Sequence, residues 1–424
     1  MKYFTGDESG LIKWISFPPK VEEKHRQKKA KKVEGSEETE KKEALQPLMG
    51  TFGKVDKEHA IQKLSWAMWE DEKVLLVGRK NGSIQFMSPE TGEVLREFKN
   101  NHVGTDDEKK GRFVGLFIHD RHLCVCTSTG DLSYTPLKSR KNETKTILEL
   151  GPNIEIMRGH PTQTHIFAIG GKERDLCVYD IKAIAKSKKE HEEIDSAGPN
   201  KNTSAHKKKT TRNAGLIFQA KNVKNDFLDL QQPVWIHDLQ FVNKEATKIA
   251  VATHYHQFRL YDTKAARRPI TNVEIGKHPI KVMSIGTDFN HVLYADTMSE
   301  VGMLDIRTGK RAAQFKGFTG AATDLVTVPF PKFSEEEDQT ETPKQHHVAS
   351  VSLDRFLRVH ETATVYRKLE DKAYLKQRLT CVLVDEAFEY PVPKVKTEEE
   401  QEEEEEEALW ESMELAKDRK RKHE

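Results

Sequence analysis

The sequence has few of the features that would assign it to several common classes of protein. Its 424 residues include only four cysteines, and none of these form a Cys-x-x-Cys pair: Cys124, Cys126, Cys177 and Cys381. This spacing gives neither a disulfide framework nor a zinc site, so we expect four reduced thiols. We find no apolar run of 18 residues and no signal peptide, and we therefore expect a soluble intracellular protein.

Catalytic motifs are missing as well. The chain has no Gly-x-x-x-x-Gly-Lys-Ser/Thr loop, no Gly-x-Ser-x-Gly elbow, no His-Glu-x-x-His pair and no Gly-x-Gly-x-x-Gly after a strand. His254 and His256 alternate as two metal ligands on a strand would, but no third ligand follows at a usable spacing. We expect these two histidines at a turn, and we expect no enzyme activity, cofactor or metal.

Charge is abundant and unevenly distributed. Charged residues make up 32% of the chain, more than the roughly 25% of an ordinary globular domain. They concentrate in three segments, at about 20–58, 183–214 and 331–347, and in the end of the chain, 386–424. The first two segments have no apolar periodicity and cannot bury enough surface to offset their ordering entropy. We expect three disordered insertions and a flexible tail.

The remaining sequence repeats one pattern, in which a β-rich run, a tight polar turn and a second alternating run follow one another. Without the insertions the pattern recurs about every 42 residues, within the roughly 40–45 of a WD-type propeller blade. Seven copies begin at residues 3, 74, 123, 166, 249, 292 and 348, for example "VLLVGRKNGSIQFMS" at 74–88. The sequence thus predicts an all-β fold, a seven-bladed WD40-type β-propeller over residues 1–385. A β-sandwich or two unrelated β domains is the alternative.

The first copy lacks a preceding strand, and an extra strand, "LTCVLV" at 379–384, follows the last copy. Pairing that strand with the N-terminal hairpin would remove two free sheet edges. We therefore expect the ring to close between the two ends of the repeat region. Within the last hairpin, Asp354 in "SLDRF" is expected to form a turn.

Three polar segments are candidates for binding a partner. Paired glycines at 170–171 explain a hairpin turn, but they do not explain the adjoining Lys172 and Glu173. Arg267 and Arg268 fall in a connection between strands, either as solvated charges or as contacts to phosphate or an acidic partner. The loop "NVKNDFLDL" at 222–230 is long and mixes charged with apolar residues. From it and its flank the candidates are Lys221, Asn222, Lys224, Asn225, Asp226 and Asp229.

The tail contains nine glutamates between 398 and 407, the motif "ALWESMELAK" and a basic end. Leu409 and Met413 share one helical face with Trp410 beside it, which is typical of a segment that binds a partner groove. The basic end indicates nuclear localisation or RNA contact, and its candidates are Lys417, Arg419, Lys420, Arg421 and Lys422.

Several stretches together resemble a family of WD-repeat ribosome-assembly factors. They are "FQAKNVKNDFLDLQQPVWIHDLQF" at 218–241, "GGKE" at 170–173, "YHQFRLYD" at 255–262, "RRP" at 267–269, "LDRFLRVH" at 353–360, "KAYLKQRLTCVL" at 372–383 and "LWESME" at 409–414. The resemblance implies a nucleolar, non-enzymatic factor, monomeric within early precursors of the large ribosomal subunit. It further implies contact with other assembly proteins and with precursor rRNA, and release with help of an AAA-type ATPase. The alternatives are a peptide-binding adaptor of a ubiquitin ligase or chromatin complex, and a propeller hydrolase, which would need convergent carboxylates or histidines.

Overall fold

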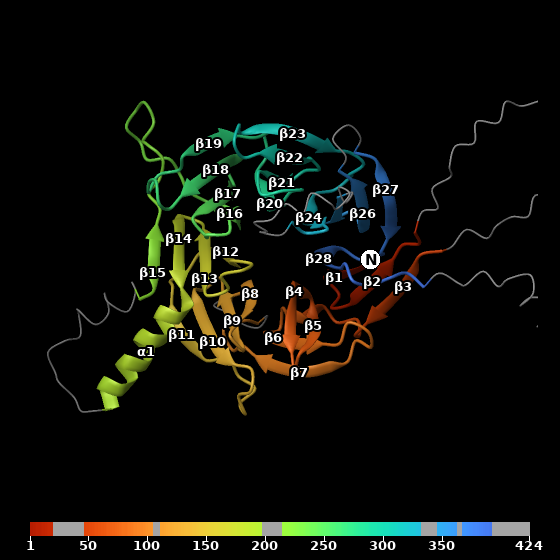
Figure 1. Ribbon diagram of the computed structural model, residues 1–424, viewed down its shortest axis with the longest axis horizontal. Helices are drawn as coiled ribbons and strands as arrows, with labels where there is room; N and C mark the ends of the chain where they lie inside the picture. The colour runs from red at the N-terminus through yellow and green to blue at the C-terminus, as the bar shows by residue number, and fades with distance from the viewer. Residues whose placement is uncertain (20–45, 105–110, 197–213, 332–345, 363–366, 392–424) are drawn as a thin grey trace, which may run out of the picture. The chain divides into compact units, whose positions relative to one another are not determined.

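The computed structural model describes residues 1–19, 46–104, 111–196, 214–331, 346–362 and 367–391. The described residues form seven antiparallel four-stranded sheets and one long helix, arranged as a ring of blades (Figure 1). The all-β, seven-bladed propeller fold is therefore confirmed. The expected disorder of the insertions and tail concerns segments that lie largely outside the described residues, and there it stays a prediction.

The strands of each sheet follow one another from the ring axis outward. Sheet 1 contains β28 (Leu379–Asp385), β1 (Lys2–Asp7), β2 (Ile12–Ser16) and β3 (Leu48–Phe52). Sheet 2 contains β4 (Ile61–Trp69), β5 (Glu72–Arg79), β6 (Ser83–Met87) and β7 (Val94–Lys99). Sheet 3 contains β8 (Phe113–His119), β9 (His122–Thr127), β10 (Asp131–Pro136) and β11 (Thr146–Glu149). Sheet 4 contains β12 (Ile154–Gly159), β13 (Ile166–Gly171), β14 (Arg174–Asp180) and β15 (Leu216–Gln219). Sheet 5 contains β16 (Ile236–Phe241), β17 (Lys248–Thr253), β18 (Gln257–Asp262) and β19 (Thr271–Glu274). Sheet 6 contains β20 (Ile280–Ile285), β21 (His291–Asp296), β22 (Val301–Asp305) and β23 (Lys310–Phe315). Sheet 7 contains β24 (Ala322–Val328), β25 (His347–Ser352), β26 (Phe356–Glu361) and β27 (Leu369–Tyr374).

The seven predicted hairpins are the two middle strands of the seven sheets. Middle strands are covered on both faces by the neighbouring blades, which explains their nearly continuous apolar sequence. Apolar side chains meet between blades; Cys124 and Leu132 of sheet 3, for example, share a buried cluster with Phe167 and Tyr179 of sheet 4. Burial raises the pKa of the Cys126 thiol to about 12, consistent with an inert core cysteine.

The ring closes as the sequence predicts. β28 pairs antiparallel with β1, with Phe4 opposite Leu383 and Lys2 opposite Asp385. The innermost strands then contact one another in a complete circle, in the order β28, β4, β8, β12, β16, β20, β24 and back to β28. Because β1 also pairs with β2 on its other side, the N-terminal strand has a partner along both of its edges.

Hydrogen bonds of one recurring type join neighbouring inner strands. All seven inner strands carry a bulge near their start. In β4, β16 and β24 the bulged residue reaches the first residue of the next inner strand. Gln62 accepts the N–H of Phe113 at 2.8 Å, and the Thr323 hydroxyl donates to the carbonyl of Leu379 at 2.9 Å. Neighbouring blades are thus held by polar bonds as well as by apolar packing.

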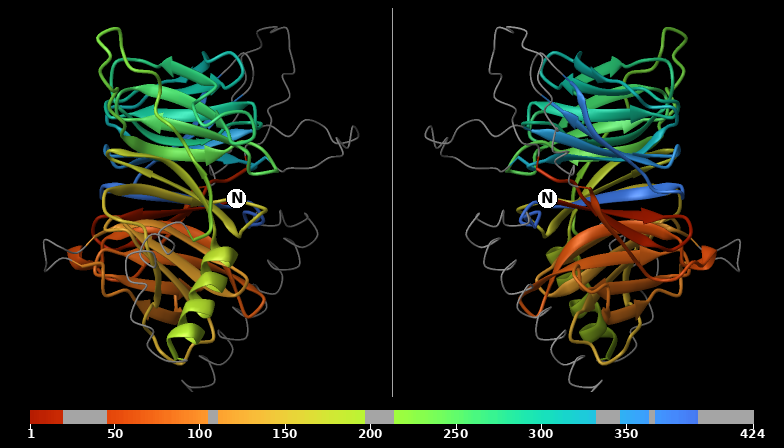
Figure 2. Two further views of the ribbon diagram at one scale, coloured as in Figure 1. Left: turned by 90° about the vertical axis from the view of Figure 1, so that its left-hand side faces the viewer. Right: turned by 90° about the vertical axis from the view of Figure 1, so that its right-hand side faces the viewer.

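Topology assigns the connections to two faces of the ring. In a four-stranded antiparallel blade, the turn between the second and third strands lies at the same end as the connection to the next blade. We call this end the turn face. Met1 and the first residue of α1 lie at the opposite face, which also carries the strand ends that flank residues 20–45, 197–213 and 332–345. Figure 2 shows the N-terminus at this side and the loop after β15 at the other.

Two segments differ from the expected insertions. Residues Leu48–Phe52 form β3, where the sequence predicts an insertion up to 58. A Cβ atom on Gly50 would lie 2.3 Å from the indole of Trp14, so this strand requires glycine at that position. Because glycine has no side chain, it interrupts the alternation of apolar and polar residues by which a strand is recognised in a sequence. Residues Ile181–Ser196 form helix α1, where the sequence predicts disorder from 183. Asp180 caps it by accepting the N–H of Lys182 at 2.8 Å, and Ile181 and Ile184 are buried in the blade core.

Candidate functional site

The ten predicted binding residues of the propeller lie on three segments near the border between sheets 4 and 5. Lys172 and Glu173 form the turn between β13 and β14, and Arg267 and Arg268 lie between β18 and β19. The other six belong to the connection from β15 to β16, which projects from the ring beside β19 (Figure 1). The structure therefore brings the three segments together, and nine of the ten residues are exposed, Asn222 being half-buried.

The root of this connection is held by a buried cation. The Arg259 side chain is 1% exposed, and its guanidinium donates to Asn272 at 3.2 Å and to Asn222 at 3.4 Å. The Asn222 amide in turn donates to the carbonyl of Gln232, which closes the neck of the loop. Because the Arg259 charge is shielded from water, removing one of its neutral acceptors would lower the free energy of unfolding.

Arg267 and Arg268 also stabilise the root. The Arg267 Nε donates to the carbonyl of Gln219 at 2.8 Å, and its own carbonyl accepts the N–H of Lys221 at 2.8 Å. The Arg268 Nε donates to the carbonyl of Asn222 at 3.3 Å. These two arginines tie the rim of sheet 5 to the loop, while their exposed guanidinium groups remain able to meet a partner.

Residues 225–230, which we call the tip, are held by their own polar side chains. The Asp226 carboxylate accepts the N–H groups of Leu228 and Leu230, both at 2.9 Å. Asn225 donates to the Asp229 carboxylate at 2.9 Å, and Asp229 has a positive φ of 60°. Such Asx-type bonds fix a tight turn without burial. The tip is thus pre-organised although solvent surrounds it.

The residues that the tip presents are apolar, and the candidates chosen from the sequence do not include them. Phe227 is 93% exposed, Leu228 63% and Leu230 60%. The polar candidates Asn225, Asp226 and Asp229 are mainly the framework that displays these three side chains. The sequence feature that indicates these apolar contacts is the order Asn-Asp-Phe-Leu-Asp at 225–229. In it, turn-forming residues flank apolar residues that no blade core accommodates.

Lys172 contacts a group of rings beside the loop. Its ammonium lies 4.9 Å from the centroid of the Trp235 ring, a cation–π distance. The other side of this group is His254, whose ring stacks on Trp235 at 4.0 Å and meets His237 edge to face. Burial lowers the pKa of His237, whose Nδ1 faces the Ile280 carbonyl at 2.9 Å. His254 and its neighbours pack and orient this corner; the described residues contain no cluster of three metal-ligating side chains.

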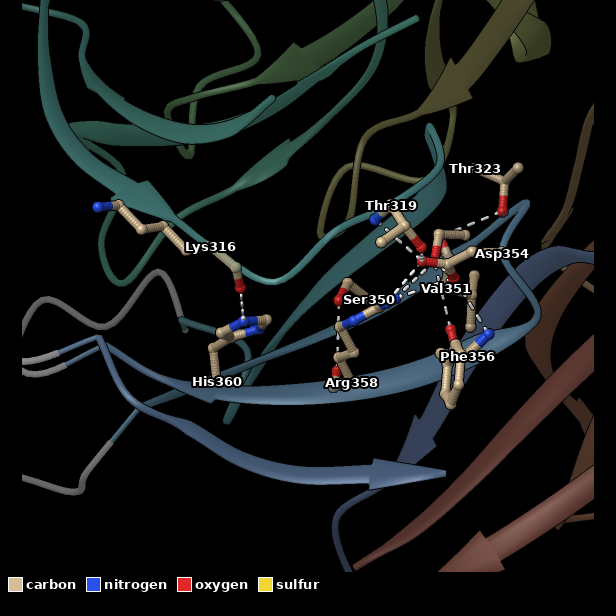
Figure 3. A network of polar contacts seen from close by, with 10 residues as sticks. Lys316, Thr319, Thr323, Ser350, Val351, Asp354, Phe356, Arg358 and His360 are labelled. Carbon is tan, nitrogen blue, oxygen red and sulfur yellow. Dashed lines mark hydrogen bonds and ion pairs between the residues drawn. The ribbon is translucent and has the colours of Figure 1, made fainter. Parts of the chain in front are cut away.

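The predicted turn former Asp354 lies in a second polar network, shown in Figure 3. Arg358, 1% exposed, forms an ion pair with Asp354 and donates to the Ser352 hydroxyl at 2.8 Å. The Thr319 hydroxyl donates to the same carboxylate at 2.8 Å. Burial would raise the pKa of Asp354, but the bonds from Arg358, Ser352 and Thr319 outweigh it and hold that pKa well below its usual range. The structural role expected for Asp354 is confirmed.

Two of the charged residues on the inner strands form an ion pair. Arg158 of β12 binds Asp238 of β16 through two nitrogens at 2.9 and 3.1 Å, and Asp238 also accepts the N–H of Met283 at 2.8 Å. Lys63 and Asp324 are partly accessible, yet their position inside the ring desolvates them, which lowers the pKa of Lys63 and raises that of Asp324. Because Asp238 already engages Arg158, this arginine is not the free cation that a peptide-reading adaptor would place at the axis.

No helix in the described part of the chain is long and apolar enough to cross a membrane. The tail candidates Leu409, Trp410 and Met413, and the basic cluster from Lys417 to Lys422, lie outside the described residues.

Comparison with known proteins identifies the family. WD repeat-containing protein 74 of Bos taurus is 31% identical over 379 residues, which cover 87% of this chain and 84% of that protein. The chain belongs to the WD repeat-containing protein 74 family. The human protein of the same name is 29% identical over 378 residues with the same coverage. Ribosome biogenesis protein nsa1 of Schizosaccharomyces pombe is 26% identical over 436 residues, covering 99% of this chain and 97% of that protein. No family model matches the chain.

The resemblance inferred from the sequence is therefore confirmed at the level of the family. The propeller fold agrees with relatives that are named as WD-repeat proteins. Membership assigns no role to an individual residue, so the ten candidates on the propeller and those of the tail stay predictions.

Proposed function

We propose that this protein is a non-enzymatic assembly factor of the large ribosomal subunit, acting in the nucleolus as one copy within a precursor particle. Four relatives, that of Schizosaccharomyces pombe among them, are named as ribosome biogenesis proteins. The observation that carries the proposal is the pre-organised tip on a closed ring: exposed apolar side chains on a rigid platform are typical of a protein-binding surface. Its partners are other assembly proteins and precursor rRNA, and an AAA-type ATPase assists its release.

Purification of the tagged protein from growing cells tests this function. We expect large-subunit assembly proteins and unprocessed large-subunit rRNA to be recovered together, with the ATPase present in substoichiometric amounts. Recovery of a ubiquitin ligase or of chromatin proteins without rRNA precursors would overturn the proposal in favour of an adaptor.

Substitution of Phe227 by Ser should weaken the complex with assembly proteins. An apolar anchor that enters a partner pocket contributes about 2 kcal/mol or more, so affinity should fall by roughly thirtyfold. Yield of partner proteins in quantitative purification measures the loss. Met298→Ser is a matched control, because Met298 lies in the turn between β21 and β22 on the same face and is 57% exposed. Equal yields from the two variants would show that the tip is not an anchor.

The tail is proposed to direct nuclear import through the basic cluster at 417–422 and to offer Leu409, Trp410 and Met413 to a partner groove. A chain ending at Pro391 should spread into the cytoplasm in fluorescence images. A full-length variant with alanine at these three apolar positions should still enter the nucleus. Nucleolar accumulation of the shortened chain would contradict the import role.

A further inference from the structure

A hollow of about 550 Å³ opens on the turn face where the ring closes, among sheets 7, 1 and 2. Five cationic side chains line it, from four different connections: Lys57, Lys80, Arg355, Lys376 and Arg378. One carboxylate from the described residues lines it as well, that of Glu8. Glu8 lies 4.0 Å from Arg378, too far to neutralise it strongly.

The connections around the hollow are fixed to one another by their main chains. The N–H of Leu375 donates to the carbonyl of Arg355 at 2.9 Å, and the N–H of Glu8 donates to the carbonyl of Arg378 at 3.1 Å. On the other side, the N–H of Lys80 donates to the carbonyl of Ala60 at 2.8 Å. The cations therefore stay close together although they repel one another, an arrangement that suits a polyanion.

An exposed ring adjoins this basic group. Tyr374 is 49% exposed, and its hydroxyl accepts a hydrogen bond from Arg355 at 3.1 Å. The inner side of the ring packs on Phe356, with centroids 5.1 Å apart, and Phe356 in turn lies under the Lys372 ammonium at 3.9 Å. The ring is thus held with part of its surface available beside the cations.

Cations that follow a surface with an aromatic platform beside them are typical of sites for single-stranded nucleic acid, in which phosphates pair with the cations and a base stacks on the ring. An acidic peptide would use the cations but has no need of the exposed ring. A second hollow differs: Lys244, Lys248 and Lys264 line it together with Glu245 and Asp262, so its charges are largely balanced.

We infer that the first hollow binds the phosphate backbone of single-stranded RNA and that Tyr374 stacks on an unpaired base. The inference rests on the proposed function, since it names precursor rRNA as the polyanion met by this face. It assigns the RNA contact to sheets 7, 1 and 2, whereas the apolar tip lies between sheets 4 and 5 on the same face. A single protein would then hold RNA and a protein partner at opposite sectors of one surface.

The test measures binding of the purified full-length protein to a labelled single-stranded RNA of about 20 nucleotides, longer than one binding site. Affinity is measured by fluorescence anisotropy at several salt concentrations. The test variant combines Lys57→Gln, Lys376→Gln and Arg378→Gln. The matched control combines Lys244→Gln, Lys248→Gln and Lys264→Gln, which removes the same charge at the second hollow.

Each lost phosphate contact should lower the slope of log affinity against log salt by about 0.7, so the test variant should lose roughly 2 from the slope and bind at least about tenfold more weakly. The control should stay within about twofold of the wild type. Tyr374→Ala should weaken binding by about fivefold or more through the lost stack, whereas Tyr374→Phe should not. Thermal unfolding of each variant checks its fold, and Arg378→Gln alone replaces the triple variant if the latter is unstable.

Wild-type affinity and slope in the test variant would overturn the inference, and so would tighter binding of polyglutamate than of RNA. Neither result depends on the purification experiment. The wild-type protein would still recover assembly factors and rRNA if the proposed function holds and the hollow is not the RNA site.

Discussion

Deletion of residues 379–384 is expected to abolish cooperative folding of the whole propeller. These residues are most of β28, the innermost strand of sheet 1 and the neighbour of both β4 and β24 around the axis. Leu379, Cys381, Val382 and Val384 are all at least nine-tenths buried. Burial of an apolar side chain contributes about 1.5–3 kcal/mol, so four of them account for a large part of a typical net stability of about 5–15 kcal/mol.

The loss extends beyond the buried area. Without β28, the inner edge of β1 is open along a strand that begins at Lys2, and Asp324 loses the N–H of Val382 that it accepts at 2.9 Å. An open edge beside apolar sequence also favours aggregation. Differential scanning calorimetry should therefore show either no cooperative transition or a much lower unfolding temperature.

A chain ending at Pro391 is the control for this deletion, because it keeps all 28 described strands. It should unfold close to the temperature of the full chain. If the deletion variant cannot be purified, Leu379→Ala gives a graded test, with an expected loss of about 2–5 kcal/mol at a fully buried position. A deletion variant that unfolds like the full chain would show that the ring does not depend on its closing strand.

The ring and its closure can be predicted from the sequence because they rest on local periodicity. Middle strands such as those at 74–79 and 83–87 are strongly apolar and are separated by a turn, a pattern that a single blade reveals. The strand at 48–52 cannot be found in this way, because Gly50 shows its purpose only when Trp14 is seen against it. Helix α1 is obscured by its charge, since its contact with the core is made by Ile181 and Ile184 near its start.

The candidate surfaces are only partly predictable for a related reason. The loop at 222–230 stands out by length and composition, but the sequence favours its polar residues as the contacts, whereas in the structure Asp226 and Asn225 hold the tip and leave Phe227 exposed. The basic hollow leaves no local trace. Lys57 and Arg378 are far apart in the chain, and only closure of the ring brings them to one opening.

The two surfaces suggest why the protein is a closed ring. The tip and the hollow belong to the same face but to opposite sectors, so their separation is set by the rigid blades between them. The strand ends that flank residues 20–45, 197–213 and 332–345 lie at the other face. A platform of this kind presents the tip and the hollow at a fixed separation on the turn face.

Asp354→Ala should destabilise the propeller by about 3–5 kcal/mol, because it leaves the Arg358 charge buried without a counter-ion. The Arg358 side chain is 1% exposed, and after the substitution it would keep the Ser352 hydroxyl as an acceptor but lose the carboxylate. Asp354 also accepts the N–H of Thr319 at 3.2 Å, so the connection that enters sheet 7 would loosen. Urea denaturation at neutral pH measures the change in unfolding free energy.

A double variant distinguishes the loss of the ion pair itself from the cost of leaving the Arg358 charge buried and unpaired. Asp354→Ala combined with Arg358→Met removes both ions, and since no unpaired charge remains, a substantial part of the stability should return.

The pH dependence has a defined sign as well. The pKa of Asp354 lies below its ordinary value in the fold, so the pair contributes fully above the unfolded pKa of about 4 and its contribution falls as the pH drops below that.

The Asp354→Ala variant also connects this polar network to the RNA site. Arg355 follows Asp354 with a positive φ of 72° and lines the basic hollow, so a loosened turn should also weaken RNA binding, by less than the triple charge variant does. A contact role for Asp354 would give the reverse pattern, with binding altered and unfolding free energy unchanged. Because the buried Arg358 and the connection that carries Thr319 both depend on the Asp354 carboxylate, we expect stability to fall first and binding to follow it.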